Sequence, residues 1–211
     1  MNKLIVIEGI EGAGKSTVKR IIKNFLKSFG IKKIFCVREP GGTPIAEKLR
    51  KIIKNGEKDE KLTYISEILL IYAARSQLLK NVIKKKLKIG YWIISDRFNI
   101  SSLAYQKGYS KTNDRIIDLL QKKILSNIKV GLTIYLDVLP KTALKRIKMR
   151  GKMDLIEKKS FVFFNKIRKK YLSLIKNKKN VIIINANLNI KKVMLSLIYQ
   201  LKNWLIKNEY K

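Results

Sequence analysis

The residues Gly9-Ile10-Glu11-Gly12-Ala13-Gly14-Lys15-Ser16, followed by Thr17, carry the clearest chemical signal in the chain. They fit the pattern G-x-x-x-x-G-K-S/T and come directly after the apolar run Leu4–Ile7. Glycines let the backbone turn tightly enough for successive amides to point at phosphate oxygens, and a following helix adds its N-terminal amides. Lys15 can reach the β- and γ-phosphates, and Ser16 can offer its hydroxyl to Mg²⁺. The motif therefore predicts a nucleoside triphosphate site.

A triphosphate site alone does not define the reaction. The guanine signature N-K-x-D of GTPases is missing, because the nearest string, Asn165-Lys166-Ile167-Arg168, ends without the carboxylate. A motor or a helicase usually needs more than the 211 residues present here. Phosphoryl transfer to a small acceptor is the remaining common use of a compact domain with this motif.

The composition excludes several kinds of catalysis. The chain has no histidine and a single cysteine, Cys36. A histidine general base, a Ser-His-Asp triad, a histidine-held metal and an internal disulfide are therefore ruled out. Any catalysis must use lysine, arginine, carboxylates, backbone amides and a metal held through oxygen.

The net charge of +33 first suggests a nucleic-acid partner. However, the excess consists of 39 lysines against 9 arginines, and the lysines are spread along the whole chain. Lysine, isoleucine and asparagine share A/T-rich codons, so drift in base composition can produce the same bias. We expect a solvated basic surface and no nucleic-acid partner. A P-loop protein that binds nucleic acid remains the alternative from a different class.

Short apolar runs alternate with amphipathic stretches. Five runs read as buried strands, at residues 4–7, 34–37, 92–95, 132–136 and 181–184, and seven stretches read as helices, near 15–29, 44–54, 62–88, 113–127, 140–150, 154–178 and 190–207. This alternation predicts an α/β fold with a parallel sheet in a single domain over residues 1–211. No transmembrane run and no signal peptide are apparent, so we expect a cytoplasmic protein.

Further strings of polar residues follow the second and third strands. These are Arg38-Glu39-Pro40-Gly41-Gly42-Thr43 with Arg50 downstream, Tyr72-Ala73-Ala74-Arg75, Asp96-Arg97-Phe98 and Ser101-Ser102-Leu103-Ala104-Tyr105-Gln106. Together with the glycine motif, they make residues 3–172 resemble the bacterial thymidylate kinases, which are P-loop nucleoside monophosphate kinases. Five of the nine arginines lie in these strings or near residue 150, namely Arg38, Arg50, Arg75, Arg97 and Arg150. Their planar forked donors suit phosphate or base edges, although any one of them could instead pair with a surface carboxylate.

The resemblance implies a role for each residue. Arg97 would contact the acceptor phosphate, with Arg38 and Arg50 completing an anion pocket beside Glu39. Glu11 would lie near the sugar 3′-hydroxyl. Arg75 and Gln106 would bond the thymine edges, and Ile71 would face the base. Ser102 and Tyr105 would line the sugar and disfavour a ribose 2′-hydroxyl, although the spacing of Tyr105 fits a half-buried core aromatic nearly as well. Asp96 ends a strand beside the glycine motif, where it could hold Mg²⁺ through water or orient the attacking oxygen.

Residues 145–157 correspond to the lid that this family carries over the donor phosphates. The family places a catalytic arginine either in the phosphate loop or in the lid, and here Gly12 stands at the loop position. We therefore expect Arg150 to supply it, with Arg146 as runner-up and a plain basic helix end as the alternative. Two residues depart from the family pattern: Ile71 replaces a stacking phenylalanine, and Leu155 replaces a common arginine.

The sequence thus predicts a three-layer P-loop fold with a five-stranded parallel sheet. The resemblance adds the strand order 2-3-1-4-5, a homodimer, and the reaction ATP + dTMP → ADP + dTDP with Mg²⁺. The acceptor phosphate is already ionised near neutral pH, so the missing histidine is no obstacle. Another nucleoside monophosphate kinase with a different base choice is the nearest alternative.

Overall fold

The computed structural model of the chain describes residues 2–56, 60–108, 111–151 and 153–208. Its elements are, in chain order, β1 (Leu4–Glu8), α1 (Lys15–Ser28), β2 (Ile34–Arg38), α2 (Pro44–Asn55), α3 (Tyr64–Leu78), the π-helical segment η1 (Leu79–Ile83), α4 (Lys84–Lys88), β3 (Trp92–Asp96), α5 (Asn99–Gln106), α6 (Lys111–Leu125), β4 (Leu132–Asp137), α7 (Pro140–Arg150), α8 (Phe161–Ile175), β5 (Val181–Asn185) and α9 (Ile190–Lys207). None of the described helices is both long and apolar enough to cross a membrane.

The five strands form one parallel sheet in the order β2-β3-β1-β4-β5. This confirms the predicted fold class and the strand order implied by the resemblance. The central strand β1 is buried at every position, and its Ile5 lies between Ile94 of β3 and Leu132 of β4. A strand with neighbours on both edges and helices on both faces must be apolar throughout, which explains the continuous run that predicted it.

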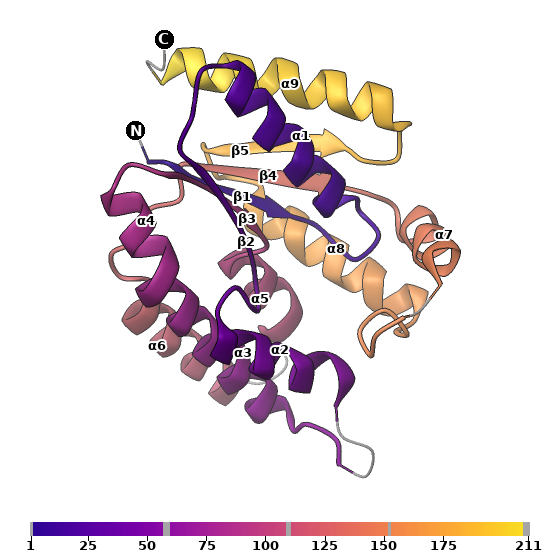
Figure 1. Cartoon of the computed structure of the whole chain (residues 1–211). Helices are drawn as coiled ribbons and strands as arrows, with labels where there is room; N and C mark the ends of the chain where they lie inside the picture. The colour runs from indigo at the N-terminus through magenta and orange to yellow at the C-terminus, as the bar shows by residue number, and fades with distance from the viewer. Residues whose placement is uncertain (1, 57–59, 109–110, 152, 209–211) are drawn as a thin grey trace.

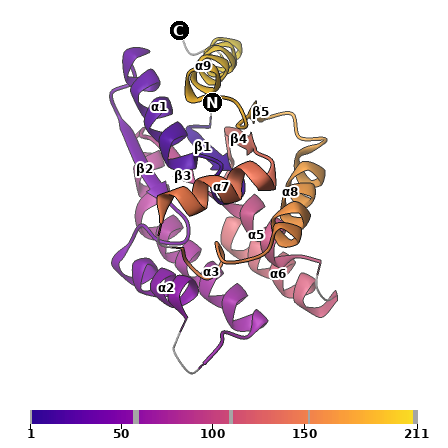
Figure 2. The same ribbon diagram turned by 90° about the vertical axis from the view of Figure 1, so that its right-hand side faces the viewer.

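Helices cover both faces of the sheet, with α1 and α9 on one side and α3, α5 and α8 on the other (Figure 1). Alternate side chains of β1 point to the two faces of the sheet. Ile5 and Ile7 belong to a core cluster with residues of α1 and α9, whereas Leu4 and Val6 pack in a second cluster with Leu78 at the end of α3. Figure 2 looks toward the carboxyl ends of the strands, where α7 crosses in front of the sheet. The catalytic motifs predicted from the sequence all lie at this end.

Polar side chains fix the starts of several helices. A serine, threonine or asparagine accepts a hydrogen bond from a first-turn amide at α2, α3, α8 and α9, through Thr43, Thr63, Ser160 and Asn189. At α2, Pro44 also occupies the first position, where its missing N–H costs nothing. The helix predicted over 154–178 begins only at Phe161, because Ser160 caps it there. The residues before it form a separate turn, in which the Asp154 carboxylate accepts hydrogen bonds from the amides of Ile156 and Glu157.

The helix α5 was not predicted, because it has no cap in its own sequence. Phe98 stands at the cap position and offers no side-chain acceptor. The carboxylate of Glu8, at the end of β1, accepts instead from the backbone N–H of Phe98 at 3.0 Å and of Ser101 at 3.3 Å. It also accepts from the Ser101 hydroxyl and, at 3.2 Å, from the hydroxyl of Tyr171 on α8. One buried carboxylate therefore holds β1, α5 and α8 together.

Burial raises the pKa of Glu8 to about 7, although the hydrogen bonds from Ser101 and the charge of Arg97 oppose the shift. Between pH 5 and 8 the unfolded chain has lost this proton while the folded chain still retains part of it, so the free energy of unfolding falls as pH rises. Glu8→Gln cannot ionise and should lack this loss. Its free energy of unfolding relative to the wild type should rise by about 2–3 kcal/mol from pH 5 to pH 8. Urea titrations at several pH values measure this difference, and a difference independent of pH would contradict the assignment.

The packing of α9 on the sheet gives a second prediction. Leu197 is fully buried in the core cluster, whereas Leu195 on the same helix is 66% exposed. Leu197→Ala should lower the free energy of unfolding by about 2–5 kcal/mol, because it leaves a cavity, and Leu195→Ala should change it by less than about 0.5 kcal/mol. Urea denaturation of the two variants compares them directly. Equal losses would show that α9 does not pack in this orientation.

Candidate active site

A cavity of about 460 Å³ opens at the carboxyl ends of β1, β2 and β3. It is lined by the phosphate loop and by residues of α2, α3, α5, α7 and the lid. The predicted site residues on its wall are Glu11, Gly12, Gly14, Lys15, Ser16, Thr17, Arg38, Glu39, Arg50, Ile71, Arg75, Asp96, Arg97, Ser102, Tyr105, Gln106 and Arg150, with the runner-up Arg146. Gly9, Ile10 and Ala13 support the loop from behind the wall. The fold thus brings strings that are far apart in the sequence into one pocket.

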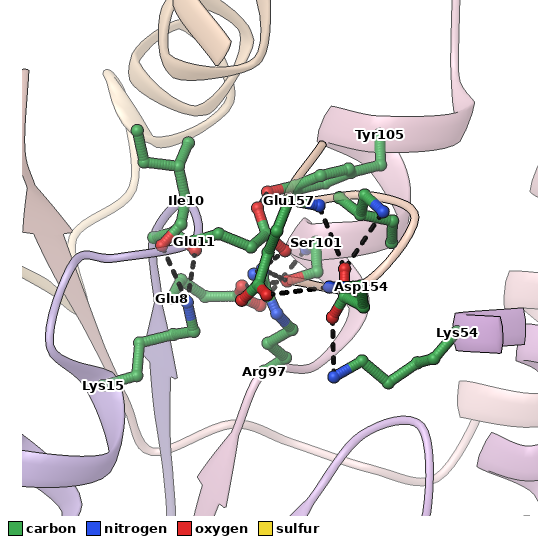
Figure 3. A network of polar contacts seen from close by, with 12 residues as sticks. Glu8, Ile10, Glu11, Lys15, Lys54, Arg97, Ser101, Tyr105, Asp154 and Glu157 are labelled. Atoms are coloured by element: carbon green, nitrogen blue, oxygen red, sulfur yellow. Dashed lines mark hydrogen bonds and ion pairs between the residues drawn. The ribbon is translucent and has the colours of Figure 1, made fainter. Parts of the chain in front are cut away.

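The side chain of Lys15 folds back onto the phosphate-loop backbone that precedes it in the sequence. Its Nζ donates to the carbonyl oxygens of Gly9 at 3.0 Å and Ile10 at 2.8 Å (Figure 3). Burial and the nearby charge of Arg97 lower the pKa of Lys15 to about 8. Lys15 forms no ion pair within the described part of the chain, so its charge lacks a direct counter-ion. A bound phosphate would supply one.

Gly12 lies directly beneath α7. Its φ is +73°, and a Cβ placed there would lie 2.4 Å from the carbonyl oxygen of Ala143. The loop therefore has no space for a side chain at position 12 unless α7 moves. The guanidinium of Arg146 lies close by, with Nη1 3.5 Å from the Gly12 oxygen. This steric limit agrees with the expectation that a catalytic arginine must come from outside the loop.

Glu11 and Arg97 form an ion pair in the middle of the pocket (Figure 3). Arg97 Nη2 donates to Glu11 at 2.6 Å, and Nη1 donates to the hydroxyls of Ser101 and Tyr171. Burial alone would lower the pKa of Arg97, but the Glu11 carboxylate raises it well above the ordinary value. The backbone of Arg97 has a φ of 71°, a left-handed conformation that costs energy in a residue other than glycine. The fold thus tolerates local strain to direct this side chain into the pocket.

Tyr105 is part of the same cluster. Its hydroxyl donates to Glu11, and its ring lies 5.3 Å from the guanidinium carbon of Arg97. The ring also packs edge-on against Tyr171 and Phe163 of α8. The two roles considered from the sequence, pocket lining and core aromatic, are therefore combined in one side chain.

Arg75 lies on the floor of the pocket and is 2% exposed. Its Nε donates to Glu39 at 2.7 Å, and its Nη2 donates to Ser102 at 2.8 Å. Burial raises the pKa of Glu39, while the charge of Arg75 opposes this. Two buried atoms of this group, Arg75 Nη1 and Glu39 Oε1, have no hydrogen-bond partner among the described residues. Ser102 is almost fully buried and holds Arg75, whereas the sequence placed it beside the sugar; the sugar contact stays a prediction.

Arg38 and Arg50 also line the cavity. Arg38 donates to Glu47 at 2.8 Å, and Glu47 also accepts from the Gly42 amide. Arg50 donates only to the Pro40 carbonyl oxygen and has no ion pair among the described residues. Burial and the charge of Arg38 lower the pKa of Arg50. The expected anion pocket therefore contains at least one cation without a counter-ion, which favours a phosphate ligand.

The lid rests on the end of α2. Lys54 Nζ lies 2.7 Å from the carboxylate of Asp154 (Figure 3), and the Leu155 amide donates to the Lys54 carbonyl oxygen. The side chain of Leu155 packs beside Gly56, where α2 ends. Arg150 donates to Glu157 at 2.6 Å and is more than half exposed. Of the predicted lid, 145–157, only Lys152 lies outside the described residues.

The oxygen donors in the pocket suit Mg²⁺. The hydroxyl of Ser16 is exposed, and the Asp96 carboxylate accepts no hydrogen bond from the described residues, with Lys19 Nζ 4.0 Å away. Among the described residues no group of three or more His, Cys, Asp or Glu could hold a metal by itself. Mg²⁺ commonly takes one or two protein oxygens and completes its shell with water and phosphate. The residues present therefore fit Mg²⁺ as a partner of a bound nucleotide.

Sequence reasoning missed several residues that organise the site. They are Glu8, Glu47, Lys54, Glu67, Ser101, Glu157 and Tyr171. Two of them had a visible signal. Glu8 is a carboxylate at the end of an otherwise apolar strand, and Glu67 lies four residues before Ile71 and eight before Arg75, on one face of α3. Lys54, Ser101 and Tyr171 act through contacts with segments that are distant in the sequence. Glu47 and Glu157 pair with arginines nine and seven residues away.

Comparison with known proteins agrees with this architecture. The profile of the thymidylate kinase family matches residues 7–197. A thymidylate kinase of Buchnera aphidicola subsp. Baizongia pistaciae is 49% identical over 96% of both chains, and that of Buchnera aphidicola subsp. Acyrthosiphon pisum is 50% identical over 98% of this chain and 97% of its own. The enzyme of Blochmanniella pennsylvanica is 41% identical over 98% of both. With the phosphate loop, the arginine pocket and the lid in place, the chain belongs to the thymidylate kinase family.

Proposed function

We propose that the chain transfers the γ-phosphoryl group of ATP to dTMP, giving ADP and dTDP. One observation carries this most directly. The cavity that is lined by Lys15 and the phosphate loop is also lined by Arg97, Arg75 and Gln106. A triphosphate and a monophosphate nucleotide can therefore bind side by side in the same cavity. This is the arrangement that in-line transfer needs.

On the donor side, the loop amides and Lys15 bind the phosphates of ATP. Lys15 already has two carbonyl partners and a lowered pKa, and an arriving phosphate raises that pKa again by stabilising the charged form. Ser16 and Asp96 would hold Mg²⁺, which neutralises charge on the phosphates. These residues supply charge and orientation only, in agreement with the absence of histidine from the chain.

On the acceptor side, Arg97 binds the phosphate of dTMP, and Arg38 and Arg50 complete the anion pocket. A phosphate monoester has its second pKa near 6, so the attacking oxygen is already ionised at neutral pH. That oxygen forms the new bond to the γ-phosphorus, and the bond to the β–γ bridging oxygen breaks as ADP leaves. The guanidinium of Arg150 leaves Glu157 and binds the transferring phosphoryl group instead, whose negative charge it stabilises.

The base contacts are assigned to the floor of the cavity. Ile71 offers an apolar surface to the thymine ring, and Arg75 and Gln106 offer polar groups to its edge. Glu11 and Tyr105 lie where the sugar would be. The homodimer and the cytoplasmic location remain predictions from the sequence, and a P-loop protein that binds nucleic acid is not favoured.

A kinase assay with a panel of acceptors tests the proposal. With ATP and Mg²⁺, purified protein should phosphorylate dTMP far better than dCMP or AMP. Lys15→Ala should lower kcat/KM by about 10³-fold or more, because the phosphate loop loses its only lysine. Lys27→Ala, in the exposed last turn of α1, is the matched control and should retain activity. A preference for AMP, or activity retained by Lys15→Ala, would refute the assignment.

The lid arginine is tested separately. Arg150→Ala should lower kcat by about 10³-fold with little change in the KM of either nucleotide, because its contact forms mainly in the transition state. Arg146→Ala should lower kcat less than about tenfold, since this arginine is placed over the Gly12 carbonyl. Steady-state kinetics on both variants decides between them, and the reverse order of effects would assign the catalytic role to Arg146.

A further inference from the structure

Glu67 contacts Gln106, which is assigned to the base, although Glu67 itself is not among the site residues predicted from the sequence. It lies in the first turn of α3 and lines the cavity together with Ile71 and Arg75, at intervals of four residues along one helix face. Its Oε1 accepts a hydrogen bond of 2.8 Å from Nε2 of Gln106. Gln106 is the last residue of α5 and is 5% exposed. The two helices therefore meet at this bond.

This bond determines which end of the Gln106 amide faces the cavity. A glutamine side chain carries a donor, NH₂, and an acceptor, the carbonyl oxygen, on a group that can turn over. An ionised carboxylate accepts only, so the end next to Glu67 must be the NH₂. Gln106 Oε1 accepts no hydrogen bond from the described residues and is left as an acceptor in the pocket.

Arg75 supplies the complementary group. Its Nη1 is buried and makes no hydrogen bond to the residues that the structure describes, while its other nitrogens are held by Glu39, Ser102 and the Phe98 carbonyl oxygen. Arg75 and Gln106 both line the cavity, and each keeps one group without a partner among the described residues, a donor on Arg75 and an acceptor on Gln106. Thymine and uracil carry the matching pair, an O4 acceptor beside an N3–H donor. Cytosine carries the opposite pair, an N4 amino donor beside an N3 acceptor.

We propose that Glu67 is a specificity-determining residue that holds the Gln106 amide with its oxygen toward the base and so selects 4-oxopyrimidines over cytosine. This inference rests on the proposed function, because it assigns the acceptor base to this floor. Glu67 touches no substrate in this arrangement. It acts through Gln106 as a positioning residue, and its effect depends on the pattern of the base edge and not on the 5-methyl group.

The test compares three acceptors that differ at this edge. In Glu67→Gln, the new amide can offer Gln106 either a donor or an acceptor, so the Gln106 amide loses its fixed orientation. The ratio of kcat/KM for dTMP over dCMP should fall by about tenfold. The ratio for dTMP over dUMP should stay the same, since these bases share one edge, and KM for ATP should also stay the same. Glu67→Met, which fills similar space without an acceptor, should lower the dTMP/dCMP ratio as well.

Two controls separate positioning from a structural effect. Asp118→Asn makes the same chemical change at an exposed carboxylate that pairs with Lys107, next to Gln106, and should leave both ratios unchanged. In the Gln106→Ala background, adding Glu67→Gln should not change the dTMP/dCMP ratio further, because Glu67 then has nothing to orient.

The outcomes are distinct. An unchanged dTMP/dCMP ratio in both Glu67 variants, or a further fall in the Gln106→Ala background, would overturn the role of Glu67 while leaving the kinase activity in place. Failure of the wild-type protein to phosphorylate dTMP would instead overturn the proposed function. Circular dichroism and thermal unfolding of each variant establish that the ratios are measured on folded protein.

Discussion

The pocket depends on keeping several positive charges close together before any phosphate arrives. Like charges repel strongly in a partly buried space, and a free arginine samples many rotamers. The chain solves both problems by pairing arginines with carboxylates: Arg97 with Glu11, Arg75 with Glu39, Arg38 with Glu47 and Arg150 with Glu157. In each pair, the carboxylate holds the arginine side chain in one direction and balances its charge. Lys15 and Arg50 have no such partner in the part of the chain that the structure describes, so unpaired charge remains where phosphates would bind.

This pairing of arginines with carboxylates changes how the net charge of the chain is interpreted. The whole chain has only 15 acidic residues, yet Glu11, Glu39, Glu67, Asp96, Asp154 and Glu157 all line the cavity, and Glu8 and Glu47 lie directly behind it. Acidic side chains are thus concentrated at the site, in a chain with 39 lysines. A chain with +33 charges therefore does not require a nucleic acid to explain its arginines. Six of the nine arginines line the pocket, and most of the lysines lie elsewhere.

The sequence predicted the strands well because each carries its own signal. All five buried runs became strands, since a parallel strand covered on both faces must be apolar along its length. The phosphate loop and the arginine strings were predicted for a similar reason, because their residue types already specify the ligand. The helix α5 could not be predicted in this way, since its cap is Glu8, more than ninety positions away from the Ser101 amide. Likewise, nothing local shows that Ser102 holds Arg75, because the contact exists only after α3 and α5 have packed.

The lid illustrates how these pairs limit motion. The lid is attached to α2 through Lys54 and Asp154, and Arg150 has a partner in Glu157. Bringing Arg150 to the phosphoryl group therefore requires exchanging one anion for another, and it does not require ordering the side chain from a free state. An exchange of this kind costs less conformational entropy than ordering, because the turn 153–157 is held by Asp154. Because Lys54 and Arg50 lie on the same helix, the residue that attaches the lid and a residue proposed to bind the acceptor phosphate share one rigid support. The two halves of the site are thus connected through α2.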